Sequence, residues 1–348
     1  MSLKPQIKIT LDQVEKLFKK EKIIDSSNHC IEMSRFNNGV INYVYLIKTS
    51  SNDEFVLRVR TPEKVWDTIK TENEVAIHKF VLENTTIPIP KIYSFSSIPD
   101  EILGYEYIIM EKKEGVRIAT IWNSLNQEKK EIILLQIVDI LAQLRKFTFD
   151  KIGSLQIDKN GNYILSKPID LTTGPFDTFQ DFLKAQIEYR IPSIQNNERF
   201  CKYIPFIEKF LEKIIPKVEY KGKFVLTHLD IGPDNILIDP KTLQITGVLD
   251  WEWAGSYPED EDLRAEMIIE EILPDSELTK FFFFELSKRG IEKPFGFDER
   301  EQIYNFRDFL MIFVSYHWWF ERNPEKKEPF IQNEMNLFEV LVEEFNLK

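Results

Sequence analysis

Apolar residues in the first 60 positions change from a helical spacing to short alternating runs. Residues 11–20 (LDQVEKLFKK) have the helical spacing, and Thr10 followed by Gln13 resembles a capping box at the start of a helix. Between Ile31 and Arg60, the runs EMSRF, INYVYLIK and EFVLRVR are separated by the turn-rich segments NNG and TSSND. This pattern predicts a short helix followed by a three-stranded antiparallel meander.

Helical spacing returns at residues 70–82 and ends before the segment IPIPKIYSF, whose prolines impose an extended path. The next run, EYIIMEKKEG, has the character of a strand and ends in a polar, glycine-terminated segment. We therefore expect a β-rich N-lobe over residues 1–112 and a C-lobe over residues 113–348.

Most of the chain beyond residue 112 has helical spacing. Residues 128–149 carry a core-facing stripe, and similar patterns predict helices near 179–187, 200–215, 276–289, 299–322 and 333–346. One β interruption consists of KFVLT, ILID and ITGVLDW, and its polar ends should bring Asp230, Asn235 and Asp250 toward one edge. The predicted fold class is α+β.

The composition of the chain limits the classes of protein to which it can belong. Hydrophobic residues make up 43% of the chain, which is enough for a packed interior, and the most apolar segment, Phe309 to Phe320, is too short to span a membrane. A net charge of −12 argues against a nucleic-acid partner. The two cysteines lack metal-ligand spacing, and the N-terminus lacks the apolar core of a signal peptide, so we expect a cytoplasmic protein. The oligomeric state stays open.

Candidate chemistry is concentrated between His228 and Asp250. The segment HLDIGPDN has the H-x-D-x-x-x-x-N spacing that holds an acceptor hydroxyl and a magnesium ion in phosphoryl transfer. Each of these residues taken singly is a common turn former with local hydrogen bonds. The fixed spacing, together with Asp250 after the next strand, favours a kinase site over unrelated turns.

The sequence resembles the aminoglycoside phosphotransferases and their choline-kinase-like and fungal relatives over nearly its whole length. The resemblance rests on HLDIGPDNILID, VLDWEWAG, VLRVR, ENEVAIHKF, IPIPKIYSF and YIIMEKKEGVRI. It implies a bilobal protein-kinase-like fold. The N-lobe would be a small antiparallel sheet with one main helix, and the C-lobe would be larger and mainly helical.

The resemblance also implies roles for individual residues. Asp230 would orient or deprotonate the acceptor hydroxyl, and Asn235 and Asp250 would bind Mg²⁺ that bridges the phosphates of ATP or GTP. His228 would brace the catalytic loop, with a general base as the alternative role for a buried histidine.

On the N-lobe side, the family position of the phosphate-binding lysine falls on Arg58, for which a solvated strand cation is the alternative. Its expected partner is Glu74, with Glu72 as the second choice. Asn38 and Gly39 would lie in the turn that covers the phosphates, although NNG is also an ordinary hairpin turn. Glu111 and Lys112 would lie where the connection between the lobes meets the adenine edge.

Two departures from the family pattern leave catalytic competence open. Arg58 replaces the usual lysine, and Leu229 stands where much of the family has glycine. A nucleotide-binding pseudokinase or partner-binding protein is therefore the alternative to an enzyme. A protein kinase is less favoured, because Tyr257-Pro258-Glu259 follows Asp250 too closely for an activation loop.

The acceptor is predicted only as a small molecule with a hydroxyl group. Trp251, Trp253 and Tyr257 lie close in sequence to the acidic run at residues 259–262, a mixture that suits an amine-bearing substrate. The alternative is that the tryptophans belong to the core and the acidic run caps the next helix.

Overall fold

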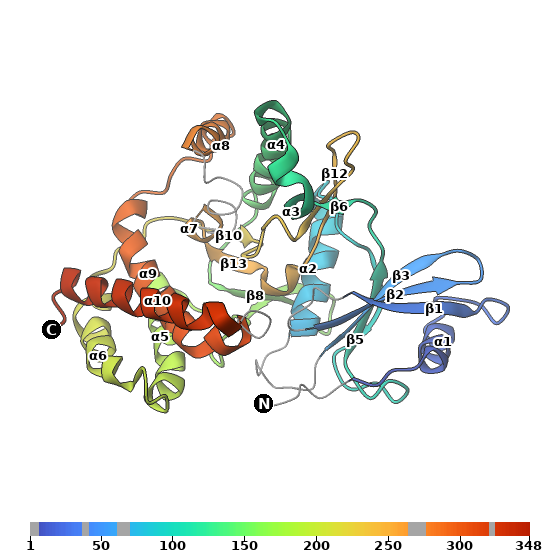
Figure 1. Ribbon diagram of the computed structural model, residues 1–348, viewed down its shortest axis with the longest axis horizontal. Coiled ribbons are helices and arrows are strands. Elements are labelled where there is room, and N and C mark those ends of the chain that lie inside the picture. Colours follow the sequence, from blue (N-terminus) through green and yellow to red (C-terminus); the bar gives the residue numbers. More distant parts are fainter. Residues whose placement is uncertain (1–6, 37–41, 61–69, 264–275, 320–323) are drawn as a thin grey trace.

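A computed structural model describes residues 7–36, 42–60, 70–263, 276–319 and 324–348. The described chain forms two lobes, with a β-sheet at one end and a helical body at the other (Figure 1). The helix α2, drawn in light blue, lies between them.

The N-lobe sheet is antiparallel throughout and has the strand order β1-β2-β3-β5-β4. Helix α1 begins at the predicted capping box, in which Thr10 and Gln13 exchange hydrogen bonds. The predicted meander is confirmed as the first part of this sheet. The N-lobe elements are α1 (Leu11–Lys20), β1 (Cys30–Phe36), β2 (Asn42–Thr49), β3 (Glu54–Arg60), α2 (Lys70–Asn84), β4 (Ile92–Ser96) and β5 (Tyr107–Glu111).

Alternation along β3 separates two environments. Phe55, Leu57 and Val59 pack into the apolar core between the sheet and α1. Arg58 therefore points to the opposite face, where its side chain is buried against α2. The strand thus presents a buried cation to the main helix of the N-lobe.

The C-lobe contains more β-structure than the sequence pattern predicts. A five-stranded sheet with the order β7-β10-β13-β8-β9 crosses its described part, and β11 pairs with both β12 and β6. The expectation of a single β interruption is therefore wrong. Strands of two to five residues carry too few positions for a clear period of two, and their pairing joins distant segments.

The predicted helices of the C-lobe are present, and α4 ends at Leu144 rather than continuing to Phe149, which lies in β7. The C-lobe elements are β6 (Val116–Arg117), α3 (Ile118–Ile121), α4 (Gln127–Leu144), β7 (Thr148–Phe149), β8 (Gly153–Ile157), β9 (Tyr163–Ser166), α5 (Phe179–Gln195), α6 (Ile204–Lys213), β10 (Phe224–Thr227), β11 (Ile236–Ile238), β12 (Ile245–Val248), β13 (Gly255–Pro258), α7 (Asp260–Leu263), α8 (Ser276–Lys288), α9 (Phe297–Trp319) and α10 (Pro324–Glu344).

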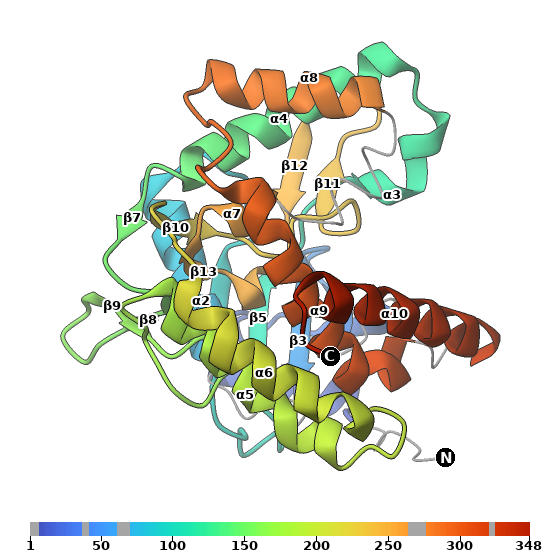
Figure 2. The same ribbon diagram turned by 90° about the vertical axis from the view of Figure 1, so that its left-hand side faces the viewer.

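Two apolar cores support the strands that carry the candidate site. One lies among α2, α4, α8 and the β11–β12 hairpin, and the other lies among α5, α6, α9 and α10. Figure 2 shows α4 alongside α8 at one end of the C-lobe, with α5 and α6 at the other. The segment Phe309–Phe320 belongs to α9 up to Trp319, and its Leu310 and Phe313 are core residues. No helix among the described residues is long and apolar enough to cross a membrane.

Candidate active site

The loop after β10 holds Asp230 through a contact made by Asn235. The amide nitrogen of Asn235 donates to the main-chain oxygen of Asp230 at 2.9 Å and to its Oδ2 at 2.9 Å. The loop is therefore closed on itself, and the carboxylate of Asp230 has a fixed direction. Because its amide nitrogen is committed to Asp230, the side-chain oxygen of Asn235 is the atom that a cation could use.

The β11–β12 hairpin carries Asp250 to the same place. Ile236 pairs with Val248, and the N–H of Leu249 donates to the main-chain oxygen of Asn235 at 2.8 Å. Asp250 has φ of 63° and ψ of 58°, a left-handed conformation that aspartate tolerates better than most residues. The predicted approach of Asp230, Asn235 and Asp250 is confirmed, although β10 pairs with β13 and not with this hairpin.

His228 connects the loop of Asp230 to the end of β12. Its Nδ1 accepts a hydrogen bond from the N–H of Asp230 at 3.2 Å, and its Nε2 donates to the main-chain oxygen of Leu249 at 3.0 Å. Burial lowers the pKa of the imidazole to about 3, so the ring is neutral near pH 7. These contacts suit a brace, because neither ring nitrogen faces an open position.

Carboxylates outnumber cations at the site. Burial raises the pKa of Asp230 to about 7, and the charge of Asp250 adds to this effect. The pKa of Asp250 is raised as well, first by the protein packed around it and then by Glu252, although 42% of its side chain is exposed. An excess of negative charge in a partly buried site favours a bound cation.

The oxygen atoms available from the site residues suit Mg²⁺ better than a metal ion whose ligands all come from the protein. Among the described residues, no three His, Cys, Asp or Glu side chains form a metal cluster. Asn235 and Asp250 instead offer oxygen atoms from two side chains. Mg²⁺ in nucleotide sites commonly takes one or two protein oxygens and completes its shell with phosphates and water.

Arg58 reaches the site from the N-lobe. Its Nη2 forms a buried ion pair with Glu74, as expected, whereas Glu72 is exposed and bonds Ser97 at 3.0 Å. The other nitrogen, Nη1, lies 3.9 Å from Asp250 Oδ1. Arg58 is thus buried in an ion-pair network and is not a solvated strand cation.

Comparison with known proteins identifies the family of the chain. The model of the phosphotransferase enzyme family matches residues 32–265, which is 234 of 348 residues. The chain belongs to the phosphotransferase enzyme family. The predicted family and enzyme class are therefore confirmed.

Solved members of the family share the fold. The ADP-bound structure of aminoglycoside phosphotransferase APH(2'')-Ib is 17% identical, with a TM-score of 0.63, over 96% of this chain and 99% of that chain. A gentamicin complex of APH(2")-IIa is also 17% identical, with a TM-score of 0.62, over 94% and 96% of the two chains. The predicted bilobal kinase-like fold is thereby confirmed.

A curated relative is a subtelomeric hrmA-associated cluster protein of Aspergillus fumigatus, 26% identical over 188 residues. The alignment covers 53% of this chain and 37% of that protein. The chain thus spans well under two-thirds of the length of this relative.

Other residues predicted for the phosphotransferase site are less closely tied to it. Asn38 and Gly39 lie outside the described residues. Glu111 uses its N–H to bond the main-chain oxygen of Lys91 at 2.8 Å, so an adenine base could use that group only by breaking this bond. Lys112 forms ion pairs with Glu54 and Glu114. Roles for these four residues stay predictions.

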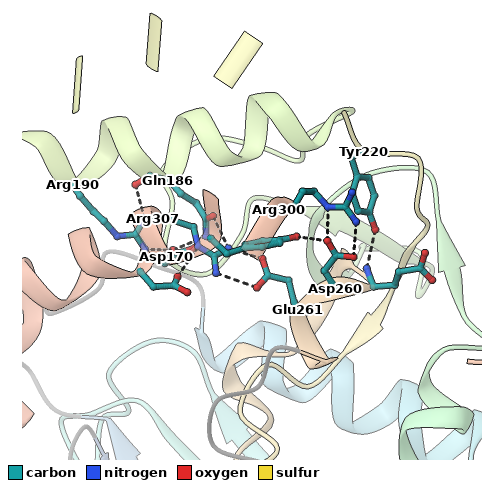
Figure 3. A network of polar contacts seen from close by, with 11 residues as sticks. Asp170, Gln186, Arg190, Tyr220, Asp260, Glu261, Arg300 and Arg307 are labelled. Carbon is teal, nitrogen blue, oxygen red and sulfur yellow. Dashed lines mark hydrogen bonds and ion pairs between the residues drawn. The ribbon is translucent and has the colours of Figure 1, made fainter. Parts of the chain in front are cut away.

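The acidic run after Asp250 is engaged within the C-lobe of this phosphotransferase. Asp260 is fully buried and binds Arg300 at 2.7 Å, and Glu261 binds Arg307 at 2.5 Å (Figure 3). Glu259 lies 3.7 Å from Arg145. These described carboxylates therefore hold α9 and the C-terminal end of α4 against the end of β13, and their charges are engaged within the protein.

The aromatic residues near Asp250 are also part of the structure. Trp251 is fully buried and donates to the main-chain oxygen of Val248 at 2.9 Å, and Tyr257 is buried in the core of α5 and α9. The ammonium group of Lys70 lies 4.1 Å from the centroid of the Trp253 ring. The alternative interpretation of core tryptophans therefore holds for Trp251, whereas Trp253 is partly exposed and lies beside Lys70.

Sequence reasoning missed two charged residues of the site, Lys70 and Glu252. Lys70 Nζ lies 3.2 Å from Glu252 Oε1, and both side chains are almost fully buried. A signal for Lys70 was available, because it precedes Glu74 by four residues and so shares its face of α2. Glu252 follows Asp250 by two residues, but only the folded structure shows that it points toward α2.

Proposed function

We propose that this chain transfers the γ-phosphoryl group of ATP or GTP to a hydroxyl of a small molecule, with Mg²⁺ as the metal. The observation that carries the proposal is the hydrogen bond from Asn235 to Asp230, together with the bond from the N–H of Leu249 to Asn235 that brings the neighbouring Asp250 beside them. The charge of Asp250 contributes to raising the pKa of Asp230 to about 7. A turn built only for structure gains nothing from gathering carboxylates that repel one another.

Asp230 supplies the chemistry on the acceptor side. The acceptor oxygen forms a bond to the γ-phosphorus, the bond from phosphorus to the β–γ bridging oxygen breaks, and the hydroxyl proton moves to the Asp230 carboxylate. A pKa of about 7 allows this carboxylate both to be ionised in a useful fraction of molecules and to hold a proton. Asn235 keeps the carboxylate oriented throughout.

Asn235 and Asp250 would hold Mg²⁺, which neutralises phosphate charge when it is bound. Arg58 Nη1 lies 3.9 Å from Asp250 Oδ1 and would bind the nucleotide phosphates beside the metal. Its pairing with Glu74 fixes the guanidinium, because one of its two nitrogen ends is committed. The residues therefore support positioning and electrostatic stabilisation, which are the main needs of phosphoryl transfer.

The acceptor class is a small hydroxyl compound, and the described residues favour no amine group on it. Gentamicin is bound by a structural relative, and we include aminoglycosides only as one class in the test. Amino alcohols, sugars and hydroxy amino acids are the other classes.

Nucleotide binding is tested first, by thermal unfolding of the full chain with Mg²⁺ and ATP or GTP. A ligand at 100 times its Kd stabilises the native state by about 2.7 kcal/mol, which raises the melting temperature by several degrees. Asp250→Ala should remove this shift. The absence of any shift in the wild-type protein, with either nucleotide, would contradict the proposal.

Turnover is tested by nucleotide consumption over the acceptor panel, with Asp230→Ala as the matched inactive protein. We expect at least one acceptor class to increase consumption in the wild type only. Binding without turnover across the panel favours the pseudokinase alternative. Equal turnover by Asp230→Ala would show that this residue is not the acceptor-side base.

A further inference from the structure

Three N-lobe elements converge on the carboxylate of Glu252. Lys70, the first residue of α2, places its Nζ 3.2 Å from Glu252 Oε1. Asn42, at the start of β2, donates to Glu252 Oε2 at 3.0 Å. Arg58 of β3 has its Nη1 3.6 Å from the same oxygen. Glu252 therefore links the N-lobe to the segment that carries Asp250.

The main chain of this segment is fixed from the same helix. Asn73 donates its side-chain amide to the main-chain oxygen of Glu252 at 3.3 Å and to that of Ala254 at 3.1 Å. Helix α2 thus positions both the backbone and the carboxylate of Glu252. Glu74, the partner of Arg58, belongs to the same helix, so α2 contacts both Arg58 and the segment of Glu252.

Arg58 is consequently shared among three carboxylates. Its Nη2 binds Glu74, while its Nη1 lies 3.6 Å from Glu252 and 3.9 Å from Asp250. A lysine at this position has a single nitrogen and could not serve Glu74 at one end while facing Asp250 with the other. Under the proposed function, the Nη1 end is the part that must be available to nucleotide phosphates.

Glu252 competes for that end of Arg58. A buried carboxylate requires a counterion, and Glu252 is 3% exposed. Without Lys70, Arg58 would be the remaining cation in direct contact with Glu252 among the described residues.

We propose that Lys70 is a positioning residue whose charge satisfies Glu252 and so leaves Arg58 available to the nucleotide phosphates. The inference rests on the proposed function, because it takes Arg58 as a phosphate-binding residue. Lys70 contacts Glu252 directly and acts through it. The role requires no contact between Lys70 and the nucleotide.

The experiment measures the Kd of Mg·ATP for four full-length variants by calorimetry. Lys70→Met should raise the Kd at least tenfold, because Glu252 then takes Arg58. Lys70→Met combined with Glu252→Gln should restore the Kd to within about threefold of the wild type, because the competitor is gone. Lys70→Arg should bind nearly as the wild type does. Lys79→Met, on the exposed side of the same helix, is the matched control and should not change the Kd.

Rescue by the second substitution separates positioning from a contact with phosphate or a loss of structure. If the double variant binds as weakly as Lys70→Met, the inference is wrong. It is also wrong if Lys70→Met binds as the wild type does. If Lys70→Met does not fold, the Kd of the single variant Glu252→Gln is measured instead. Binding of Mg·ATP at least as tight as in the wild type supports the inference. Binding that is tenfold weaker contradicts it.

Failure of the proposed function would look different. In that case the wild-type protein itself shows no binding of Mg·ATP or Mg·GTP, and the inference falls with it. If the wild type binds and only the rescue fails, the proposed function stands while the role of Lys70 is rejected.

Discussion

Asp230, the proposed acceptor-side base, illustrates how a buried carboxylate can weaken the fold that holds it. Its pKa is raised from 3.8 to about 7, mainly by burial and then by Asp250. The folded protein therefore binds this proton more tightly than the unfolded chain does. The free energy of unfolding falls as pH rises from about 4 to about 7. Above that range the destabilisation by the ionised carboxylate is constant.

Asp230→Asn should remove this destabilisation and the activity together. Asparagine keeps an oxygen for the amide of Asn235. We expect the variant to gain roughly 1–3 kcal/mol of unfolding free energy at pH 8.5 and little at pH 4, with no turnover at either pH. Urea denaturation at the two pH values measures this difference. Equal gains at both would show that ionisation is not the cause.

Leu229 has a strained backbone conformation beside Asp230. Its φ is 63°, in the left-handed region, and its partly buried side chain packs against the core of α5 and α9. Alanine loses the packing and keeps the strain, whereas glycine loses the packing and relieves the strain.

Leu229→Gly should therefore be more stable than Leu229→Ala by about 1 kcal/mol, the reverse of the order in an ordinary loop or helix. The midpoints of urea denaturation for the two variants give the comparison. A more stable alanine variant would mean that the left-handed conformation costs nothing here. Turnover in the glycine variant that is no higher than in the wild type would show that the departure from the family pattern does not limit chemistry.

At the scale of elements, helix α2 contains both Glu74, the expected partner of Arg58, and Glu72, a glutamate that serves as a matched control for mutation of Glu74. Glu74 and Glu72 lie on one helix, but Glu74 is buried against Arg58 and Glu72 is exposed. Glu74→Gln should raise the Kd of Mg·ATP about tenfold, because a neutral partner holds the guanidinium less firmly. Glu72→Gln should leave the Kd unchanged. Equal effects of both variants would argue against a specific role for the ion pair.

The same elements show which features can be predicted from sequence. The capping box of α1, the hairpin β11–β12 and the cluster of Asp230, Asn235 and Asp250 depend on neighbours in sequence, so local patterns reveal them. The sheet that joins β7 to β10 and β13 depends on pairing between distant short strands. The link between Lys70 and Glu252 joins residues 182 positions apart and was invisible for the same reason.

At the scale of the whole molecule, the polar network in Figure 3 joins C-lobe elements that are distant in sequence. Asp260 is fully buried, receives two hydrogen bonds from Arg300 at 2.7 and 3.1 Å, and accepts a third from Tyr304 at 3.1 Å. It therefore connects the end of β13 to α9. A buried ion pair of this kind adds little over an apolar contact, but removal of one partner leaves an unpaired charge inside the protein.

Asp260→Asn should accordingly lower the free energy of unfolding by about 3–5 kcal/mol, because Arg300 stays charged and buried. The Michaelis constant for an acceptor found in the panel should not change at a temperature where the variant is folded. Asp298→Asn, in the first turn of α9, breaks an exposed ion pair with Lys293, which precedes the helix; it is the control and should alter stability little. If Asp260→Asn instead raises the Michaelis constant of an amine-bearing acceptor and leaves stability unchanged, the acidic run does contact substrate.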